Sequence, residues 1–258
     1  MDHLLPSPAI IAHRGASVYA PENTLAAFEL AVRQNADAIE LDAKLSVDGC
    51  VVVIHDQTVD RTTTGSGKVD QLSLPALKEF DAGKPFDPSF AGETIPTLDE
   101  VFEAVGEKIF INVELTNYQS PRDPLAEKVA KIVLRHNLED HLLFSSFNPL
   151  VLRRIHRILP QVPLGLLAIP GSSGAWARSF LGRWWVPYQA LHPELKDTSK
   201  SLIQNCHHRG HRIHTYTVNQ PQDMRRLFSW GVDGIFTDDP LLAQRTLAEF
   251  IQENPPTT

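Results

Sequence analysis

The sequence predicts an α/β protein folded as one TIM (β/α)8 barrel, with a small insertion after the second strand hairpin. Short apolar runs alternate with helical patterns along the whole chain, which is typical of parallel βα units. The chain has 258 residues, and α/β barrels of about 250 residues form a single domain. One pair of apolar runs is too closely spaced for a parallel crossover and therefore forms a hairpin. We expect a single domain over residues 1–258.

Nine apolar runs bounded by turn-forming residues are candidate strands. They cover residues 9–14, 37–45, 50–55, 109–115, 141–147, 163–169, 188–192, 212–218 and 234–237. The second and third runs flank an Asp-Gly pair at 48–49, which favours a two-residue type I′ turn. This turn places Leu45 opposite Val52 and Asp42 opposite His55 across an antiparallel hairpin. With the returning strand outside the barrel, eight parallel strands remain.

Helical patterns fill most of the gaps between these runs. The first begins after cap-type residues at 21–24, which precede an apolar face starting at Leu25. The longer stretch at about 56–108 contains a segment, 62–92, that is rich in Thr, Gly, Pro and Asp. We expect it to be an insertion that covers the barrel mouth. The other helices are expected at 124–137, 149–159, 198–209, 221–230 and 240–252.

Composition and charge exclude several classes of function. The chain carries 24 basic and 31 acidic residues, a net charge of −7, so no broad positive field attracts nucleic acid or an anionic membrane. Cys50 and Cys206 form neither a disulfide framework nor a zinc motif, and we expect buried thiols. Residues 1–9 do not resemble a signal peptide, and no apolar run is long enough to span a membrane. A cytoplasmic location is therefore expected.

Three acidic residues are expected to face one another inside the barrel. Because side chains alternate along a strand, Glu40 and Asp42 share a face, and Glu114 on the next barrel strand also points inward. Such carboxylates repel one another unless a cation or a proton lies between them. Oxygen ligands alone favour Mg²⁺ or Ca²⁺. The alternative is an ion network in which the acids pair with Arg14 or Lys44.

Two histidines and an arginine end strands at the same mouth. His13 and Arg14 close the first strand, and His55 closes the hairpin beside Asp42. Imidazole titrates near neutral pH and can act as a general acid or base, and a guanidinium suits phosphate oxygens. A single histidine at the end of a strand is more often structural, but two of them beside three carboxylates favour acid–base chemistry.

Short motifs follow one another along most of the chain. They read HRGASVYAPENTLAAF, IELDAKLSVDGCVVVIHD, DRTTTGSG, DAGKPF, IPTLDEV, INVEL, SSFNP, TYTVN and GIFTDDP. In these motifs, from Ala12 to Pro240, the chain resembles the glycerophosphodiester phosphodiesterase family of TIM-barrel phosphodiesterases. The resemblance implies a metal-dependent enzyme that hydrolyses glycerophosphodiesters, such as glycerophosphocholine and glycerophosphoethanolamine, to sn-glycerol 3-phosphate and an alcohol.

The resemblance also implies roles for individual residues. It places a divalent cation, Mg²⁺ or Ca²⁺, on Glu40, Asp42 and Glu114. It places the catalytic acid–base pair on His13 and His55. Both sets agree with the chemistry expected from the residue types alone.

The resemblance places substrate binding on Arg14, which meets the phosphate, and on Phe147 and Tyr216. The chain departs from the family at two positions. Thr116 stands where the family usually has a lysine that contacts phosphate, and Tyr216 stands where tryptophan is common. The tyrosine keeps an aromatic face toward the glycerol, whereas loss of the lysine would alter affinity or substrate range.

Two alternative functions use the same residues. A lysophospholipase D of the same superfamily would act on a substrate that keeps an acyl chain, and a protein that binds phosphodiesters without turnover is the alternative of another class. The loop at 170–187 carries Trp184 and Trp185 and is expected on the mouth side. These tryptophans either contact lipid peripherally or pack on the barrel. Neither a nucleic-acid partner nor stable membrane insertion is expected.

Overall fold

The strands form at the apolar runs of the sequence, and most of their residues are buried. The computed structural model describes residues 5–116 and 122–255. In the sheet the strand order is β1-β9-β8-β7-β6-β5-β4-β2-β3, and β1 also pairs with β2. This last pairing closes eight parallel strands into a barrel and leaves β3 outside, which confirms the predicted fold class. The strands are β1 (Ala9–Ala12), β2 (Ala38–Leu45), β3 (Val51–Val53), β4 (Phe110–Leu115), β5 (Leu142–Ser146), β6 (Leu164–Ala168), β7 (Ala190–Pro193), β8 (Arg212–Thr215) and β9 (Gly234–Thr237).

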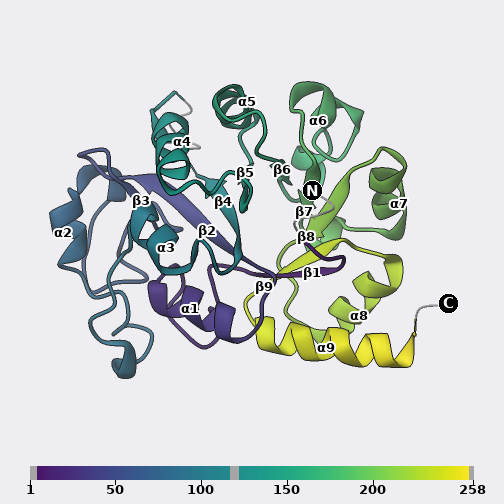
Figure 1. The fold of residues 1–258 in the computed structure, drawn as a ribbon, viewed down its shortest axis with the longest axis horizontal. Helices are drawn as coiled ribbons and strands as arrows, with labels where there is room; N and C mark the ends of the chain where they lie inside the picture. The colour runs from purple at the N-terminus through teal and green to yellow at the C-terminus, as the bar shows by residue number, and fades with distance from the viewer. Residues whose placement is uncertain (1–4, 117–121, 256–258) are drawn as a thin grey trace.

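Helices surround the closed sheet (Figure 1). They are α1 (Leu25–Arg33), α2 (Leu74–Lys78), α3 (Leu98–Val105), α4 (Leu125–His136), α5 (Pro149–Ile158), α6 (Phe180–Trp185), α7 (Lys200–His208), α8 (Pro221–Trp230) and α9 (Pro240–Glu253). Polar caps fix several of their starts. Thr24 accepts a hydrogen bond from the backbone of Ala27, and Thr97 forms a reciprocal capping box with Glu100. Short 3₁₀ turns occur at Val69–Gln71, Pro88–Phe90, Gly171–Gly174 and Leu195–Asp197.

The two faces of the barrel sheet hold different residues. Ile39 and Leu41 belong to the main apolar cluster, together with helix residues such as Phe28. Because successive side chains on a strand face opposite sides, the residues between them point into the barrel. The barrel interior can therefore hold polar groups while the helix layer holds the core.

The hairpin between β2 and β3 differs in register from the predicted one. Leu45 pairs with Val51, one residue earlier than expected. The backbone N–H of Ile54 donates to the carbonyl of Asp42, so Ile54 takes the place predicted for His55. The predicted pairing was therefore wrong by one residue.

A three-residue turn causes this shift. The N–H of Ser46 donates to the carbonyl of Cys50, and the carbonyl of Ser46 accepts from the N–H of Gly49. Gly49 has a φ of +76°, the left-handed conformation that ends such three-residue hairpin loops. The Ser46 hydroxyl bonds Asp48 and the Cys50 N–H, which stabilises this turn over the two-residue one.

The segment between β3 and β4 packs against the hairpin. In Figure 1, α2 lies at the outer edge of the molecule, beyond β3. Arg61 of this segment reaches groups at the barrel mouth, as described below. That the segment covers the mouth stays a prediction. Its separate apolar cluster contains Val52, Ile54, Val59, Val69, Leu77 and Ile95.

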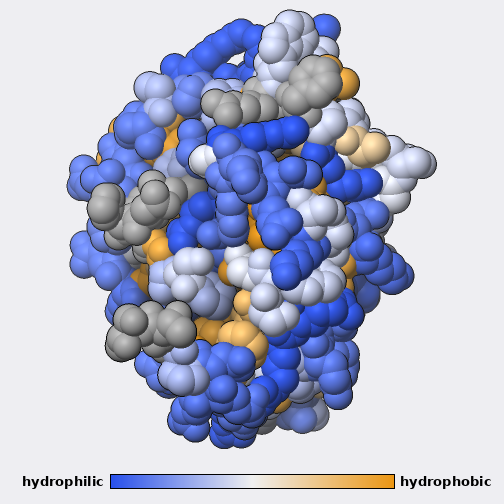
Figure 2. Space-filling model, turned by 90° about the vertical axis from the view of Figure 1, so that its right-hand side faces the viewer, coloured by the Kyte–Doolittle hydropathy of each residue, from blue (hydrophilic) through white to orange (hydrophobic). Residues whose placement is uncertain are grey.

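The molecular face shown in Figure 2 is mostly hydrophilic, and its hydrophobic residues form small separate areas. Within residues 5–116 and 122–255, no helix is both long and apolar enough to cross a membrane. Both observations agree with the lack of a long apolar run in the sequence.

Candidate active site

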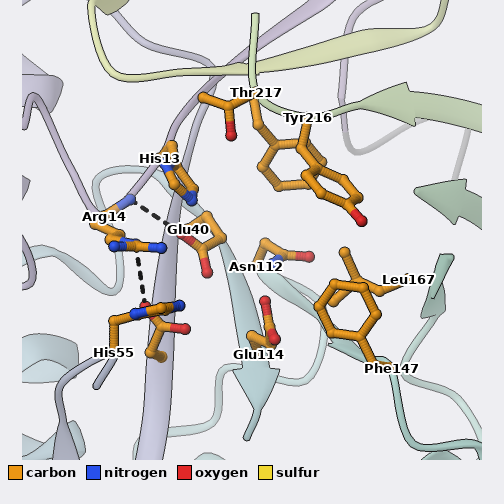
Figure 3. A pocket seen from close by; sticks show the side chains of 12 residues that line it. His13, Arg14, Glu40, His55, Asn112, Glu114, Phe147, Leu167, Tyr216 and Thr217 are labelled. Carbon is orange, nitrogen blue, oxygen red and sulfur yellow. Dashed lines mark hydrogen bonds and ion pairs between the residues drawn. The ribbon is translucent and has the colours of Figure 1, made fainter. Parts of the chain in front are cut away.

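Three carboxylates meet in the barrel interior. The register of β2 with β4 places Glu40 beside Asn112 and Asp42 beside Glu114. One ligand oxygen from each of the three acids lies within 4.8 Å of the other two. Figure 3 shows Glu40, Asn112 and Glu114 around a common space. The structure thus brings together the three acids that the sequence singled out.

The closeness of the three acids most affects the ionisation of Glu40. Burial, together with the charges of Asp42 and Glu114, raises the pKa of Glu40 well above its ordinary value. A cation between the oxygens would offset this repulsion. Within the described part of the chain, the buried side-chain carbonyl of Asn112 has no hydrogen-bond partner, so another oxygen lies beside the acids. Oxygen donors alone fit a hard divalent cation such as Mg²⁺ or Ca²⁺.

Arg14 follows β1 in a tight turn. Its φ is +56° and that of Gly15 is +85°, and a Cβ on Gly15 would lie 2.7 Å from Ala27, so glycine is required there. The turn aims the Arg14 N–H at Glu40 Oε2, 3.0 Å away. The Arg14 guanidinium donates to Glu22 at 2.9 Å, and its Nε lies 3.5 Å from Asp42 Oδ2. Arg14 therefore has a fixed position at the edge of the acid cluster.

His13 is oriented by a carboxylate that comes from the far end of the chain. Its Nδ1 lies 2.7 Å from Asp238 Oδ1. An ionised carboxylate only accepts hydrogen bonds, so Nδ1 carries the proton and Nε2 is the atom available for proton transfer. Asn219 donates to the other Asp238 oxygen at 2.6 Å. Although burial opposes ionisation, the hydrogen bonds from His13 and Asn219 lower the pKa of Asp238.

His55 has a similar partner in a more exposed setting. Its Nδ1 lies 2.7 Å from Asp56 Oδ1, and its side chain is 44% exposed, against 20% for His13. Arg61 also binds Asp56, at 2.6 and 3.1 Å. The hydrogen bonds from Arg61, helped by the one from His55, lower the pKa of Asp56 to about 2. Arg61 shares Glu22 with Arg14, and this sharing links the two halves of the mouth.

Lys44 occupies the outermost position of the inward face of β2. Its ammonium donates to the Thr116 hydroxyl at 2.8 Å, and that hydroxyl donates to the carbonyl of Ala43 at 2.8 Å. Burial lowers the pKa of Lys44, whereas the charges of Asp42 and Glu114 raise it. The cation thus lies above the acids and is held by a neutral group.

Two aromatic rings form one wall of the site. Phe147 and Tyr216 meet edge to face, with ring centroids 6.0 Å apart. The Tyr216 hydroxyl donates to the carbonyl of Ala168 at 2.7 Å, which fixes the ring. Figure 3 shows the Tyr216 and Phe147 rings on the same side of the pocket. The wall can pack against the carbon skeleton of a ligand while the acids and histidines meet its polar groups.

These groups line a single cavity of about 250 Å³. Every site residue predicted from the sequence is among its lining residues. The remaining lining residues are Asn112, Leu167, Thr217 and Phe236. The predicted residues that line it are His13, Arg14, Glu40, Asp42, His55, Glu114, Phe147 and Tyr216.

Sequence reasoning missed the groups that hold these residues. Asp238 and Asn219 lie within the quoted motifs GIFTDDP and TYTVN, yet nothing local shows that they meet His13. Asp56 directly follows His55, and this adjacency was the available signal for their pairing. The position of Arg61 depends on how the segment after β3 folds back, which no short pattern specifies.

Comparison with protein families identifies the same region of the chain. Residues 13–242 match the Glycerophosphoryl diester phosphodiesterase family. A glycerophosphodiester phosphodiesterase of Caldanaerobacter subterraneus subsp. tengcongensis is 42% identical over 232 residues, covering 90% of this chain and 94% of the relative. A glycerophosphodiester phosphodiesterase of Bacillus subtilis is 32% identical, covering 89% of this chain and 83% of the relative.

Solved structures agree with the fold and with this family. A phosphodiesterase from Oleispira antarctica, in complex with the product sn-glycerol-3-phosphate, superposes with a TM-score of 0.85 at 30% identity, covering 94% of this chain and 97% of its own. A glycerophosphodiester phosphodiesterase from Agrobacterium tumefaciens gives a TM-score of 0.80 at 30% identity, covering 92% and 99%. The similarity therefore extends over the whole barrel.

Proposed function

The chain belongs to the glycerophosphoryl diester phosphodiesterase family, whose members are phosphoric diester hydrolases, and we propose that it hydrolyses glycerophosphodiesters such as glycerophosphocholine and glycerophosphoethanolamine. The products are sn-glycerol 3-phosphate and the free alcohol. The observation that carries this proposal is one cavity lined by three carboxylates, two aspartate-bound histidines and an arginine. These are the groups that a phosphodiester cleavage by acid–base chemistry requires.

The carboxylates are proposed to hold the metal. A divalent cation on Glu40, Asp42 and Glu114, either Mg²⁺ or Ca²⁺, would act as a Lewis acid on a phosphoryl oxygen and lower the pKa of a nearby hydroxyl. The raised pKa of Glu40 and the convergence of the three oxygens support this proposal. Arg14 contacts the phosphate and stabilises the negative charge that grows on it.

The two histidines are proposed to transfer protons in two steps. In the first, the glycerol 2-hydroxyl attacks phosphorus; His55 takes the hydroxyl proton, and His13 protonates the departing alcohol. In the second, water opens the resulting cyclic phosphate, with the two histidines in exchanged roles, and gives glycerol 3-phosphate. Each histidine thus returns to its starting state.

The surroundings of the two histidines support this assignment. The pairing of Asp42 opposite His55, expected from the sequence, does not occur and no longer argues for His55 as the base. Asp238 is bound by His13 and by the neutral amide of Asn219, whereas Asp56 shares its charge between His55 and Arg61. We therefore assign the acid to His13, whose carboxylate partner is not shared with an arginine, and the base to His55.

A coupled assay of glycerol 3-phosphate release tests the proposal. The protein should release it from at least one of several headgroup diesters, lose activity with chelator, and regain it with Mg²⁺ or Ca²⁺. The His13→Ala and His55→Ala variants should each lose most of the activity on glycerophosphocholine. Full activity in both variants would rule out the acid–base pair.

An exposed aromatic surface favours a second candidate, a lysophospholipase D. Trp184 is 79% exposed and Trp185 is 44% exposed, and Leu181 and Ile169 of the same segment after β6 are also exposed. These residues follow β6, so they lie on the side of the barrel where the strands end and the cavity opens. An acyl chain leaving the cavity could pack there, and a lipid surface could be contacted peripherally.

Two measurements separate the candidates. A lysophospholipase D turns over lysophosphatidylcholine faster than glycerophosphocholine. Lipid contact predicts that the Trp184→Ser and Trp185→Ser double variant binds liposomes less tightly while its turnover of glycerophosphocholine is unchanged. Equal binding of the wild type and the double variant to liposomes would show that the two tryptophans do not contact lipid. A cytoplasmic location also remains part of the proposal, on the basis of the sequence.

A further inference from the structure

The proposed reaction leaves a charge imbalance at the mouth. Three carboxylates carry more negative charge than one divalent cation neutralises, and a phosphodiester adds another. Arg14 is already engaged by Glu22 at 2.9 Å and by Asp42 at 3.5 Å. A second cation close to the acids would therefore strengthen phosphate binding more than it would on an open surface.

Lys44 is the cation that the strands place in this position. On β2 it follows Asp42 by two residues, so both side chains share the inward face and lie about 7 Å apart along the strand. Thr116, directly after the end of β4, follows Glu114 by two residues in the same way. Asp42 pairs with Glu114, so Lys44 and Thr116 form the next layer outward from the acids.

The Thr116 hydroxyl fixes where the ammonium lies. It donates its proton to the carbonyl of Ala43, which leaves its oxygen to accept from Lys44. An ammonium has three N–H donors, and the bond to Thr116 uses one of them. The acceptor that holds Lys44 in place is a neutral hydroxyl, so this contact does not cancel the positive charge.

On the basis of the proposed function, we propose that Lys44 is a second phosphate-binding residue and that Thr116 positions it. Position 116 is the one where the resemblance to the family leads to the expectation of a lysine, and the chain has threonine there. The same layer of the mouth still carries a cation, supplied by β2 instead of β4. The substitution at Thr116 therefore moves the cation by one strand and does not remove it.

Replacement of Lys44 tests this inference directly. Lys44→Met should raise the KM for glycerophosphocholine and the inhibition constant of glycerol 3-phosphate by about 10- to 100-fold, the effect of losing a charge-assisted hydrogen bond. Lys44→Arg should recover most of the loss because it keeps the charge. Lys131→Met, on the exposed face of α4, is the matched control and should leave both constants unchanged.

A swap within the layer is the stricter experiment. Lys44→Thr alone should bind glycerol 3-phosphate weakly, and Lys44→Thr combined with Thr116→Lys should return to within about threefold of the wild type. Because the swapped protein keeps both side-chain types, it tests the inference even if Lys44→Met fails to fold. Recovery of glycerol 3-phosphate binding in the swapped protein would show that a lysine at either position 44 or position 116 can bind the phosphate.

The alternative role for Lys44 is to balance the acids without touching the ligand. In that case Lys44→Met would bind the metal alone more tightly, measured by calorimetry with Mg²⁺ or Ca²⁺, while glycerol 3-phosphate inhibition stayed the same. Unchanged inhibition would overturn the inference. If the wild type hydrolyses no diester, the proposed function fails, and calorimetric binding of glycerol 3-phosphate to the wild type and to Lys44→Met still decides the role of Lys44.

Discussion

Two pairs of histidines differ in their surroundings, one at the mouth of the barrel and one in its interior. At the mouth, His13 and His55 each place Nδ1 2.7 Å from an aspartate. Across the interior, on β7 and β8, His192 and His214 are fully buried with ring centroids 5.1 Å apart. Within the described residues, no ring nitrogen of this second pair has a hydrogen-bond partner. Burial lowers the pKa of His192 to about 3, and burial with the nearby His192 lowers that of His214 well below its ordinary value.

The comparison shows that surroundings, and not residue type, decide what a histidine does here. A carboxylate on Nδ1 and access to the cavity equip the first pair for proton transfer. The second pair consists of neutral rings that pack with Phe236 and fill space. Gly165 makes room for them, because a Cβ there would lie 2.3 Å from the His192 ring.

The largest expected effect distinguishes the two mouth histidines from each other. His13→Ala and His55→Ala should each lower kcat/KM for glycerophosphocholine by about 10²- to 10⁴-fold, the contribution of general acid–base catalysis. With a nitrophenyl diester, whose leaving group needs no proton, the kcat/KM of His13→Ala should return close to the wild-type value, whereas that of His55→Ala should stay low. Recovery of His55→Ala instead would reverse the assigned roles. His214→Leu is the control from the buried pair.

The aspartate partners should matter unequally. Asp238→Asn should reduce kcat by about 10- to 10³-fold, since an amide can present its N–H to Nδ1 and favour the wrong tautomer. Asp56→Asn should reduce it less, because Arg61 already shares that carboxylate. Steady-state kinetics of both variants, with melting temperatures as the folding control, check this order. Equal losses would contradict the difference drawn between the two pairs.

The buried pair should affect stability and not catalysis. The pKa of His192 is lower in the folded chain than the ordinary 6.5, so the unfolded chain binds more protons below that pH. The stability is fully present above pH 6.5 and falls as the pH drops toward 3, by at most about 1.4 kcal/mol per pH unit for each histidine. Denaturant midpoints between pH 7 and 4, at roughly one-unit steps, measure this slope. His214→Leu should flatten the slope, and an unchanged slope would show that other groups cause the acid sensitivity.

The smallest expected effect concerns Glu22, which joins the two halves of the mouth. Glu22→Gln removes the charge shared by Arg14 and Arg61 and should lower kcat/KM by about threefold to tenfold. Because Glu22 binds both Arg14, next to His13, and Arg61, which holds the aspartate partner of His55, the pH–rate profile should change on both limbs. A change on a single limb would show that the two halves act independently.

The sequence predicts the barrel and the chemical groups of its cavity well. Every observed strand and most of the helices fall on predicted runs, because apolar periodicity reports burial directly. The inward direction of Glu40, Asp42 and Glu114 follows from strand alternation. The hairpin register was missed because Asp-Gly suits two turn lengths, and the hydroxyl of Ser46 selects the longer one.

Contacts between distant parts of the chain lie beyond such patterns. His13 and Asp238 are separated by 225 positions, and only the pairing of β1 with β9 brings them together. His192 and His214 gave no signal either, since a histidine inside an apolar run shows neither its direction nor its partner. Local periodicity defines the elements, whereas the closure of the barrel defines these pairs.

The pairing of β1 with β9 has a consequence for the growing polypeptide. The three carboxylates proposed to hold the metal lie on neighbouring strands in the first half of the chain, but the aspartate that orients His13 follows the last strand. A nascent chain or a fragment that stops before β9 contains all three acids of the cluster. It also contains His13, but it lacks the Asp238 carboxylate that orients the His13 ring. Catalytic competence is therefore expected only once synthesis is nearly complete, so truncated products should remain inert even where they retain cation affinity.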